Sequence, residues 1–353
     1  MSNYFCGLLM HSQKYHPSML TGAMLDAFLA RGWFRMGQAV FTTHYLRFQQ
    51  QFYPAVWLRY GLTIGQLPLI ESKLRKVEKK LKVQISPWLL DEEQESLFTI
   101  YREHSGLAMS PSLREILLGE HSNNIFETWQ VAVRDGERLI GLGIFDLGEH
   151  AAAGIINIYH PEFKHFSLGK MLMYLKIRYC LRLGYSWFYP GYAVPGYKKF
   201  DYKLEFFSHQ IEYYHAPFES WLPYHPKAGL PNFLEQLQAP LESLIGRLRA
   251  ANINGRLVYY PGFDLALADD KLPEVLSAPV FLLLAYEDVT EKSTIVVYDL
   301  EKEGFRIMNC RPFHKNGWAF EGSKCICFDL MQVIDRSENI FKEKEIMKIM
   351  GTG

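Results

Sequence analysis

Three short extended segments between helical ones most constrain how this chain folds. They are rich in strand-forming residues, and the turn Asp135-Gly136 between the first two predicts a β-hairpin. A helical segment, residues 168–183, follows and is stopped by Gly184 before another strand, residues 185–189. This order of strands, helix and strand predicts an α+β fold with a mixed or antiparallel sheet. The extended segments are residues 128–134, 138–146 and 153–159.

Helices are also predicted before this core. Residues 18–31 and 89–103 carry apolar residues at helical spacing, and a further helix follows Pro111. Residues 71–82 predict an amphipathic helix with a basic outer surface, since six lysines or arginines oppose two glutamates. That surface is either a solvated charged face or one that contacts phosphates. Residues 33–60 predict two or three strands.

Length and composition indicate an ordinary globular protein of two or three domains. The chain has 353 residues, of which 48% are hydrophobic and 22% charged. Four prolines in residues 217–232 predict a linker. We therefore expect domains at residues 1–85, 86–225 and 230–353. The last combines several strands with a closing helix at residues 335–350, and we expect it to be an α/β module.

The balance of charge excludes a strong attraction of the whole molecule to DNA or to an anionic membrane. Lysines plus arginines number 38, as do aspartates plus glutamates, so any nucleic-acid site must be a local patch. The longest apolar run, residues 279–286, is far shorter than the roughly 20 residues of a spanning helix. The N-terminus also lacks the pattern of a signal segment. We expect a soluble, cytoplasmic protein with no membrane or DNA partner.

The cysteines favour reduced thiols over a disulfide framework. Their number, five, is odd, and Cys325 and Cys327 are spaced as C-x-C, which does not suit a shared zinc site. Residues 191–196 have the glycine gap of a phosphate-binding loop, but Tyr197 stands where that motif needs lysine. We expect no metal or other cofactor. The remaining cysteines are Cys6, Cys180 and Cys310.

The order of elements resembles GNAT-type acyltransferases, in which the central sheet splays where a helix begins. The resemblance implies a GNAT-like core with a gap between residues 155–159 and 185–189, near Ser167, Leu168 and Gly169. Backbone N–H groups in such a gap can bind an oxyanion, and the helix N-terminus adds partial positive charge. The acetyl-CoA signature of that fold is a glycine-rich turn, of which this chain has only Gly169.

Several stretches, in the same order, resemble the aminoacyl-tRNA-protein transferases of the N-end rule. These arginyl and leucyl transferases attach an amino acid from tRNA to a protein N-terminus. The resemblance covers residues 5–215 and implies arginine or leucine as the transferred amino acid. Residues 136–146 (GERLIGLGIFD), 158–162 (IYHPE) and 167–169 (SLG) are similar to the family's GKLIAVGVxD, YYDP and SLG. Residues 189–192 (YPGY), 199–203 (KFDYK), 32–37 (GWFRMG) and 97–104 (LFTIYREH) are similar to its YLGYY, KMxYK, GFRRSG and LFxxYxxxH.

One departure from the family concerns its cysteine-rich N-terminal motif. After GFRRSG this chain has residues 40–44 (VFTTH) and no cysteine cluster, and Cys6 stands alone. Iron-sulfur or metal-linked regulation is therefore not carried over. Residues 230–353 lie outside the resemblance.

The chemistry of aminoacyl transfer suggests three candidate catalytic residues. The ester is already activated, so the enzyme must align a neutral amine and stabilise an oxyanion. Asp146 could bind the attacking ammonium and take its proton, or it could cap a turn before Gly148. Tyr159 could line the gap. Ser167 could supply a hydroxyl, or it could cap the helix that follows.

Nine further residues are candidates for binding the substrates. Alternating aromatic and basic residues near the end of the matched region suit the acceptor end of tRNA, through phosphate pairing and base stacking, although a solvated loop has the same composition. Gln130 adjoins Trp129, which we expect in the core. The candidates are Arg35, Gln130, Leu168, Gly169, Tyr192, Lys198, Lys199, Tyr202 and Lys203.

Three functions are compatible with these residues. The first is transfer of an amino acid from aminoacyl-tRNA to a protein or peptide N-terminus. The second is a CoA-dependent GNAT N-acyltransferase. The third is a non-catalytic relative that binds tRNA or protein, for which the missing cysteine cluster is the motivating observation.

Overall fold

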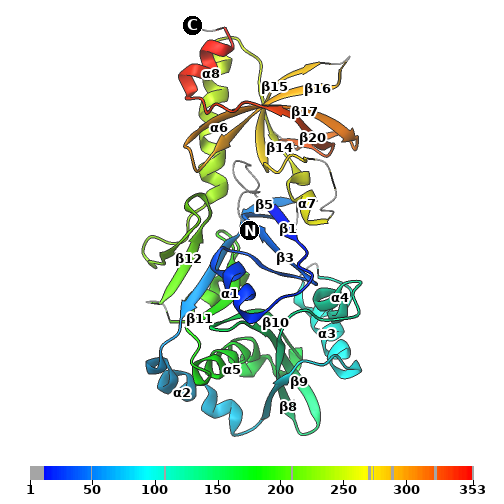
Figure 1. The fold of residues 1–353 in the computed structure, drawn as a ribbon, viewed down its shortest axis with the longest axis vertical. Coiled ribbons are helices and arrows are strands. Elements are labelled where there is room, and N and C mark those ends of the chain that lie inside the picture. Colours follow the sequence, from blue (N-terminus) through cyan, green and yellow to red (C-terminus); the bar gives the residue numbers. More distant parts are fainter. Residues whose placement is uncertain are drawn as a thin grey trace. The chain divides into compact units, whose positions relative to one another are not determined.

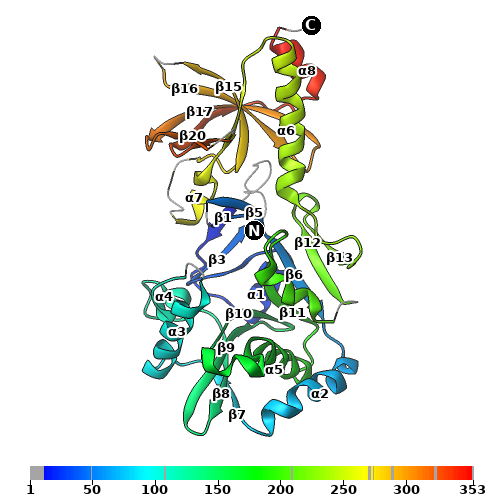
Figure 2. The same cartoon turned by 180° about the vertical axis from the view of Figure 1, so that it is seen from behind.

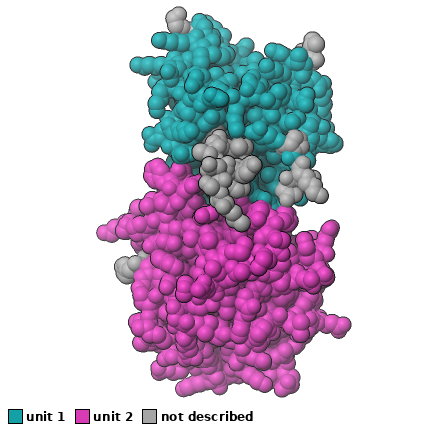
Figure 3. All heavy atoms as spheres, viewed as in Figure 1, with its two compact units in different colours: residues 1–14, 42–55, 231–353 teal, residues 15–41, 56–230 magenta. Residues whose placement is uncertain are grey.

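The chain divides into two compact units in the computed structural model (Figures 1 and 2, and by colour in Figure 3). The structure describes residues 12–48, 50–106, 109–207, 210–268, 272, 274–287, 290–321 and 324–351. Unit 1 comprises Met1–Lys14, Thr42–Ala55 and Pro231–Gly353, and unit 2 comprises Tyr15–Phe41 and Val56–Leu230. No helix in the described ranges is both long enough and apolar enough to cross a membrane.

An eight-stranded sheet forms the centre of unit 2. Its strand order is β13-β12-β6-β11-β10-β9-β8-β7. All neighbouring strands run antiparallel except β10 and β11, which are parallel. The strands are β6 (Val56–Gly61), β7 (Lys82–Pro87), β8 (Thr128–Asp135), β9 (Arg138–Leu147), β10 (Ala151–Tyr159), β11 (Trp187–Ala193), β12 (Ile211–His215) and β13 (Ser220–Pro223). The predicted α+β class with a mixed sheet is confirmed.

Helices cover both faces of this sheet because neighbouring side chains of a strand point to opposite sides. On β9, Phe145 joins the buried cluster of α5 (Leu168–Arg182) and α2 (Leu67–Glu78). Its neighbour Ile144 joins the cluster of α3 (Glu92–Ser105) and α4 (Leu113–Leu118). The remaining elements of unit 2 are α1 (Gly22–Ala30), β2 (Phe34–Met36), β3 (Ala39–Thr43), which continues into unit 1, and the 3-10 helices η1 (Ile64–Gln66), η2 (Pro161–Phe166), η3 (Lys198–Glu205) and η4 (Ala216–Phe218).

The parallel strands β10 and β11 pair over a short distance and then separate. Ala151, Ala152 and Ala153 pair with Trp187, Phe188 and Tyr189. Beyond that point β10 continues beside β9 to Tyr159, and β11 continues beside β6 to Ala193. The predicted separation therefore lies between residues 154–159 and 190–193. It does not involve residues 185–189 as expected, because 187–189 are the residues that pair with β10.

Unit 1 is built on a seven-stranded sheet with the order β18-β19-β14-β15-β16-β17-β20. Its pairs are antiparallel except β14 and β19. The helix α6 (Phe233–Ala250) packs against β14, β15 and β16 through a buried leucine stripe that includes Leu237, Leu241 and Leu248. The expected α/β module is thus a mostly antiparallel sheet with a packed helix, in which β15, β16 and β17 follow one another as antiparallel neighbours.

The other elements of unit 1 include a hairpin from an early part of the chain. The two strands of this hairpin are β4 (Tyr45–Phe48) and β5 (Gln51–Pro54). The remaining elements are β1 (Ser12–Tyr15), β14 (Arg256–Tyr259), η5 (Pro261–Asp264), α7 (Leu265–Ala268), β15 (Val280–Glu287), β16 (Lys292–Asp299), β17 (Gly304–His314), β18 (Trp318–Glu321), β19 (Lys324–Cys327), β20 (Leu330–Arg336) and α8 (Glu343–Ile349); Tyr15 of β1 belongs to unit 2.

The predicted domain boundaries differ from these units. A division between residues 85 and 86 falls inside β7, which pairs with β8 over its whole length. Residues 1–85 and 86–225 are therefore not separate bodies. The expected linker at 217–232 contains β13, which pairs with β12. The expected helix at 335–350 is shorter, because β20 extends to Arg336 and α8 begins at Glu343.

Candidate active site

Three tyrosines from different elements gather where β10 and β11 separate. Tyr101 of α3 and Tyr159 of β10 have ring centroids 5.4 Å apart in an edge-to-face arrangement. Tyr202 of η3 is near both, and burial, together with the negative charge that Tyr101 and Tyr159 would carry, raises its pKa to about 12. We call these residues the tyrosine cluster. All three residues are half-buried.

The beginning of α5 lies beside this cluster. A Cβ atom added to Gly169 would lie 3.4 Å from Cε1 of Tyr159, so the tyrosine packs directly on the first turn of the helix. Ser167 is exposed, has the left-handed φ of 53°, and its side chain makes no capping hydrogen bond. The alternative that Ser167 caps the helix through its hydroxyl is therefore wrong. Leu168 is fully buried in the core, which leaves only its backbone for a substrate.

Lys203 of η3 is buried against β11. Its ammonium donates a hydrogen bond of 2.7 Å to the carbonyl oxygen of Tyr192 and lies 5.4 Å from the Tyr192 ring and 5.1 Å from the Phe200 ring. Burial lowers the pKa of Lys203 to about 7. Gly191 has a φ of 87°, and a Cβ atom there would come within 3.3 Å of the ammonium. Lys203 therefore supports the backbone of β11, and the predicted direct contact with tRNA does not fit its burial.

The other two lysines of η3 are open to solvent. Lys198 and Lys199 are both exposed, and Lys199 reaches the carbonyl oxygen of Ser105 at 3.2 Å. Gln130 lies elsewhere, on β8, where it accepts a hydrogen bond of 3.0 Å from Gln94. The structure thus brings Lys198 and Lys199, but not Gln130, to the same end of the sheet as Tyr202.

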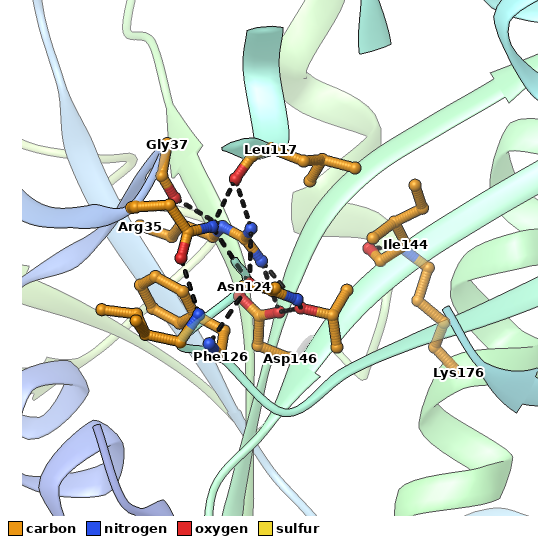
Figure 4. Close-up of polar contacts among 11 residues, drawn as sticks. Arg35, Gly37, Leu117, Asn124, Phe126, Ile144, Asp146 and Lys176 are labelled. Carbon is orange, nitrogen blue, oxygen red and sulfur yellow. Dashed lines mark hydrogen bonds and ion pairs between the residues drawn. The ribbon is translucent and has the colours of Figure 1, made fainter. Parts of the chain in front are cut away.

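A second buried lysine, Lys176 of α5, was not predicted. Its ammonium donates to the carbonyl oxygens of Ile144 at 2.9 Å and Ile156 at 3.2 Å, on the paired strands β9 and β10 (Figure 4 shows the bond to Ile144). Burial is the main cause that lowers its pKa to about 7, and the charge of Lys203 contributes to this shift. The available sequence signal was its spacing, four residues after Leu172 and four before Cys180, in an otherwise apolar stripe.

Asp146 lies inside β9 and forms a buried ion pair with Arg35. The Nη1 atom of Arg35 donates to Oδ1 of Asp146 at 2.8 Å, and the two side chains are 1% and 0% exposed (Figure 4). Burial raises the pKa of Asp146, and the positive charge of Arg35 opposes that shift. Because the carboxylate faces Arg35 in the interior, it is not open to a substrate ammonium, and the expected base role does not fit this position. It does not cap a turn either, since it pairs in the β8–β9 and β9–β10 ladders.

A network of neutral groups completes the surroundings of Arg35. Its guanidinium donates to Thr128 at 2.8 Å, to the carbonyl oxygens of Gly37 and Leu117, and to Asn124 at 3.1 Å. Gln38 binds the same oxygens of Leu117 and Asn124. Sequence reasoning identified Arg35 and Asp146 separately, but no periodicity links them, because they are 111 positions apart.

The described cysteines do not add a reactive centre. Cys180, Cys310, Cys325 and Cys327 are free and buried, and burial raises the pKa of Cys180 to about 12. Cys6 lies outside the described residues. Within the part of the chain that the structure describes, no three metal-binding side chains lie close enough together to hold an ion.

The part of the chain that contains this site is similar to known transferases. A family model described as the C terminus of arginine-tRNA-protein transferase matches residues 91–213, which run from α3 to β12. The aspartate/glutamate leucyltransferase of Vibrio cholerae serotype O1 is 25% identical over 201 residues, which are 55% of this chain and 82% of that protein. The aspartate/glutamate leucyltransferase of Aeromonas hydrophila subsp. hydrophila is 24% identical over 216 residues, 58% of this chain and 87% of that protein.

Among solved structures, the crystal structure of FemX matches with a TM-score of 0.32 and 12% sequence identity. The match covers 54% of this chain and 65% of that one.

Proposed function

We propose that this chain is an aminoacyl-tRNA-protein transferase, which moves an amino acid from aminoacyl-tRNA to the N-terminal amine of a protein; the similarity of residues 91–213 to that family supports the proposal. The observation that supports this proposal most is the content of residues 91–213. They include β10 and β11, which separate from each other, α5, which lies between these strands in sequence, and the exposed lysines of η3. The proposal includes a GNAT-like core. Under this proposal, the transferred amino acid is leucine or arginine, and the protein acts in the cytoplasm, where charged tRNA is found.

The reaction requires little acid-base catalysis from the protein. A bond forms between the acceptor nitrogen and the carbonyl carbon of the amino acid, and the ester bond to the tRNA breaks. The amine loses a proton, and the ribose oxygen of the tRNA gains one. Because the ester is already activated, alignment of the two substrates and stabilisation of the oxyanion account for most of the catalysis.

We assign the oxyanion to the first turn of α5. The N–H groups of an α-helix in its first turn have no partner within the helix, and the helix dipole adds partial positive charge there. Leu168 would act through its backbone, and Gly169, which has no side chain, lets the ring of Tyr159 pack directly on this turn. The exposed hydroxyl of Ser167 lies at the same helix end.

Different residues would hold the acceptor end of the tRNA. Tyr159 and Tyr202 of the tyrosine cluster offer ring faces for its unpaired bases, and Lys198 and Lys199 offer exposed charges for its phosphates. Tyr192 would act mainly through the shape of β11, which Lys203 supports. Arg35 and Asp146 would position β9 and the α4 region and would not touch the substrate.

A transfer assay tests this proposal. Radiolabelled leucine or arginine on tRNA is offered with a peptide that begins with aspartate, and tRNA binding is measured at two salt concentrations. Wild type should label the peptide. Lys198→Ala/Lys199→Ala should bind tRNA more weakly and with a smaller salt dependence, because fewer phosphates are neutralised. The matched control is Lys344→Ala/Lys348→Ala, which removes two exposed charges of α8.

The same assay separates the other candidate functions. If the protein transfers an amino acid from neither leucyl-tRNA nor arginyl-tRNA, the proposal is contradicted. Thermal stabilisation by acetyl-CoA in its place supports an N-acyltransferase, against which the single glycine at 169 argues. Tight tRNA binding without turnover supports a non-catalytic member of the family.

A further inference from the structure

We propose that unit 1 holds a binding site for a nucleobase in a cavity of about 760 Å³. All the residues that line the cavity belong to this one unit. They come from β5, the first turns of α6, the end of β14 and the β18–β19 hairpin. This site goes beyond the transfer reaction and does not depend on it. The residues on which the argument rests are Gln51, Phe52, Gln238, Tyr259, Glu321 and Lys324.

Two aromatic side chains, Phe52 and Tyr259, line the cavity. The ring centroids of Phe52 and Tyr259 are 5.8 Å apart, and their planes are inclined by 44°. Both side chains are half-buried, so part of each ring faces the cavity. The ammonium of Lys324 lies 5.3 Å from the centre of the Tyr259 ring. Stacking on such rings is how proteins hold unpaired bases of any sequence.

The polar groups of the cavity suit the edge of a base. Gln51 and Gln238 each carry an amide that can donate and accept, which matches the paired donors and acceptors of purine and pyrimidine edges. Gln238 is held in place, because its Nε2 atom donates to Glu242 at 2.6 Å and its side chain also bonds to Tyr259. A fixed amide selects ligands by geometry as well as by polarity.

The charges of the cavity disfavour a phosphate group as the ligand. Lys324 is the one cation among the lining residues in the described chain, and Glu321 supplies the opposite charge. Glu242 adds a second carboxylate next to Gln238. Sites that bind phosphate use several cations or a row of backbone N–H groups. A neutral, planar ligand with polar edges fits this balance, and any phosphates attached to it would stay outside.

A nucleobase could come from a free nucleoside or from unpaired RNA, and binding experiments on the full chain distinguish the two. Equilibrium dialysis measures the four labelled ribonucleosides, and filter binding measures a five-nucleotide single-stranded RNA at two salt concentrations. If the protein binds nucleosides but not the RNA, the ligand is a free nucleoside. Salt-dependent binding of the RNA, stronger than that of the nucleosides, identifies RNA as the source of the base.

Variants locate the binding. Tyr259→Ala should weaken binding roughly fivefold or more because a stacking partner is lost, whereas Tyr259→Phe keeps the ring and should bind within about twofold of wild type. Gln238→Ala should reduce discrimination among the bases. Tyr286→Ala, at an exposed tyrosine of β15 that does not line the cavity, is the control and should bind as wild type does.

Three outcomes would overturn the proposal. One is the absence of nucleoside and RNA binding at millimolar concentration by wild type. Another is binding that Tyr259→Ala and Gln238→Ala leave unchanged although both variants melt as wild type does. The third is competition by free leucine or arginine, which would make Glu321 and Lys324 a site for an amino acid.

Discussion

Asp146→Asn tests the buried ion pair at the scale of a single residue. The substitution leaves the guanidinium of Arg35 in the interior without a negative partner, at a position where both side chains are almost fully buried. Removing one partner of a buried pair costs about 3–5 kcal/mol, because the remaining charge is no longer compensated. We expect the free energy of unfolding in urea to fall by about that amount.

The control for Asp146→Asn is Glu71→Gln. Glu71 pairs with Arg182 at 3.3 Å, but the two side chains are 51% and 58% exposed. An exposed pair contributes roughly 0–1 kcal/mol, since water screens it. If the two substitutions lower stability equally, the Arg35–Asp146 pair is not the stabilising contact that its burial indicates.

Lys203 should make the stability of the protein depend on pH. Burial lowers its pKa from 10.5 to about 7 in the folded protein. Between those values the unfolded chain binds more protons than the folded one, so stability rises as the pH is raised through this window. Lys176, with a pKa also lowered to about 7, acts in the same direction.

Urea unfolding of wild type and of Lys203→Met between pH 6 and pH 9 measures this effect. The difference in unfolding free energy between wild type and the variant should grow with pH in favour of wild type. Lys198→Met, at an exposed lysine, serves as the control and should follow the wild-type curve. Parallel curves for wild type and Lys203→Met would contradict the burial of a charge at this position.

At the scale of an element, the packing of α5 on β9 requires a glycine at position 143. A Cβ atom there would lie 2.8 Å from Cε of Lys176 and 3.0 Å from Oδ1 of Asn157. Moving Lys176 aside would break the hydrogen bonds that its ammonium donates to two strand carbonyls. Gly143→Ala should therefore destabilise the protein by about 1–3 kcal/mol, measured by urea unfolding.

Gly246→Ala is the matched substitution in a helix. Gly246 lies inside α6, and nothing is within 4 Å of its added Cβ atom. Alanine has a higher helix propensity than glycine, so this variant should gain about 0.5–1 kcal/mol of stability. A loss at Gly246 as large as that at Gly143 would show that the strain at Gly143 is not specific to Lys176 and Asn157.

At the scale of the whole molecule, the segment Thr42–Ala55 belongs to unit 1 although unit 2 surrounds it in sequence. Its aromatic residues pack on the C-terminal part of the chain, as in the contacts of Tyr45 and Phe52 with Phe263. A fragment of residues 1–230 would leave these rings without their partners. We expect it to aggregate, as followed by size-exclusion chromatography.

Replacing residues 44–55 of that fragment with a short Gly-Ser linker should restore solubility. The replacement is feasible because the two ends of the segment are adjacent: the N–H of Ala55 donates to the carbonyl oxygen of His44 at 2.8 Å. If the fragment with the linker aggregates as much as the fragment without it, the exposed hairpin is not the cause.

Local sequence patterns were sufficient for the elements of the central region. Hydrophobic periodicity and turn residues predicted β8, β9, β10 and α5 within two residues of their observed ends, because each depends on contacts between near neighbours. The start of α5 and the exposed lysines of η3 could likewise be placed from sequence. The site roles assigned to these residues stay predictions.

Tertiary structure decided what these side chains can do. Arg35 and Asp146 neutralise each other across 111 positions, and Lys203 turns inward to hold the Tyr192 carbonyl, so charges that look available in the sequence are buried. Membership of residues 42–55 in unit 1 is equally invisible along the chain. Sequence alone determined the order of elements and the family resemblance; long-range packing determined burial, and burial sets whether a charged group meets a substrate or supports the fold.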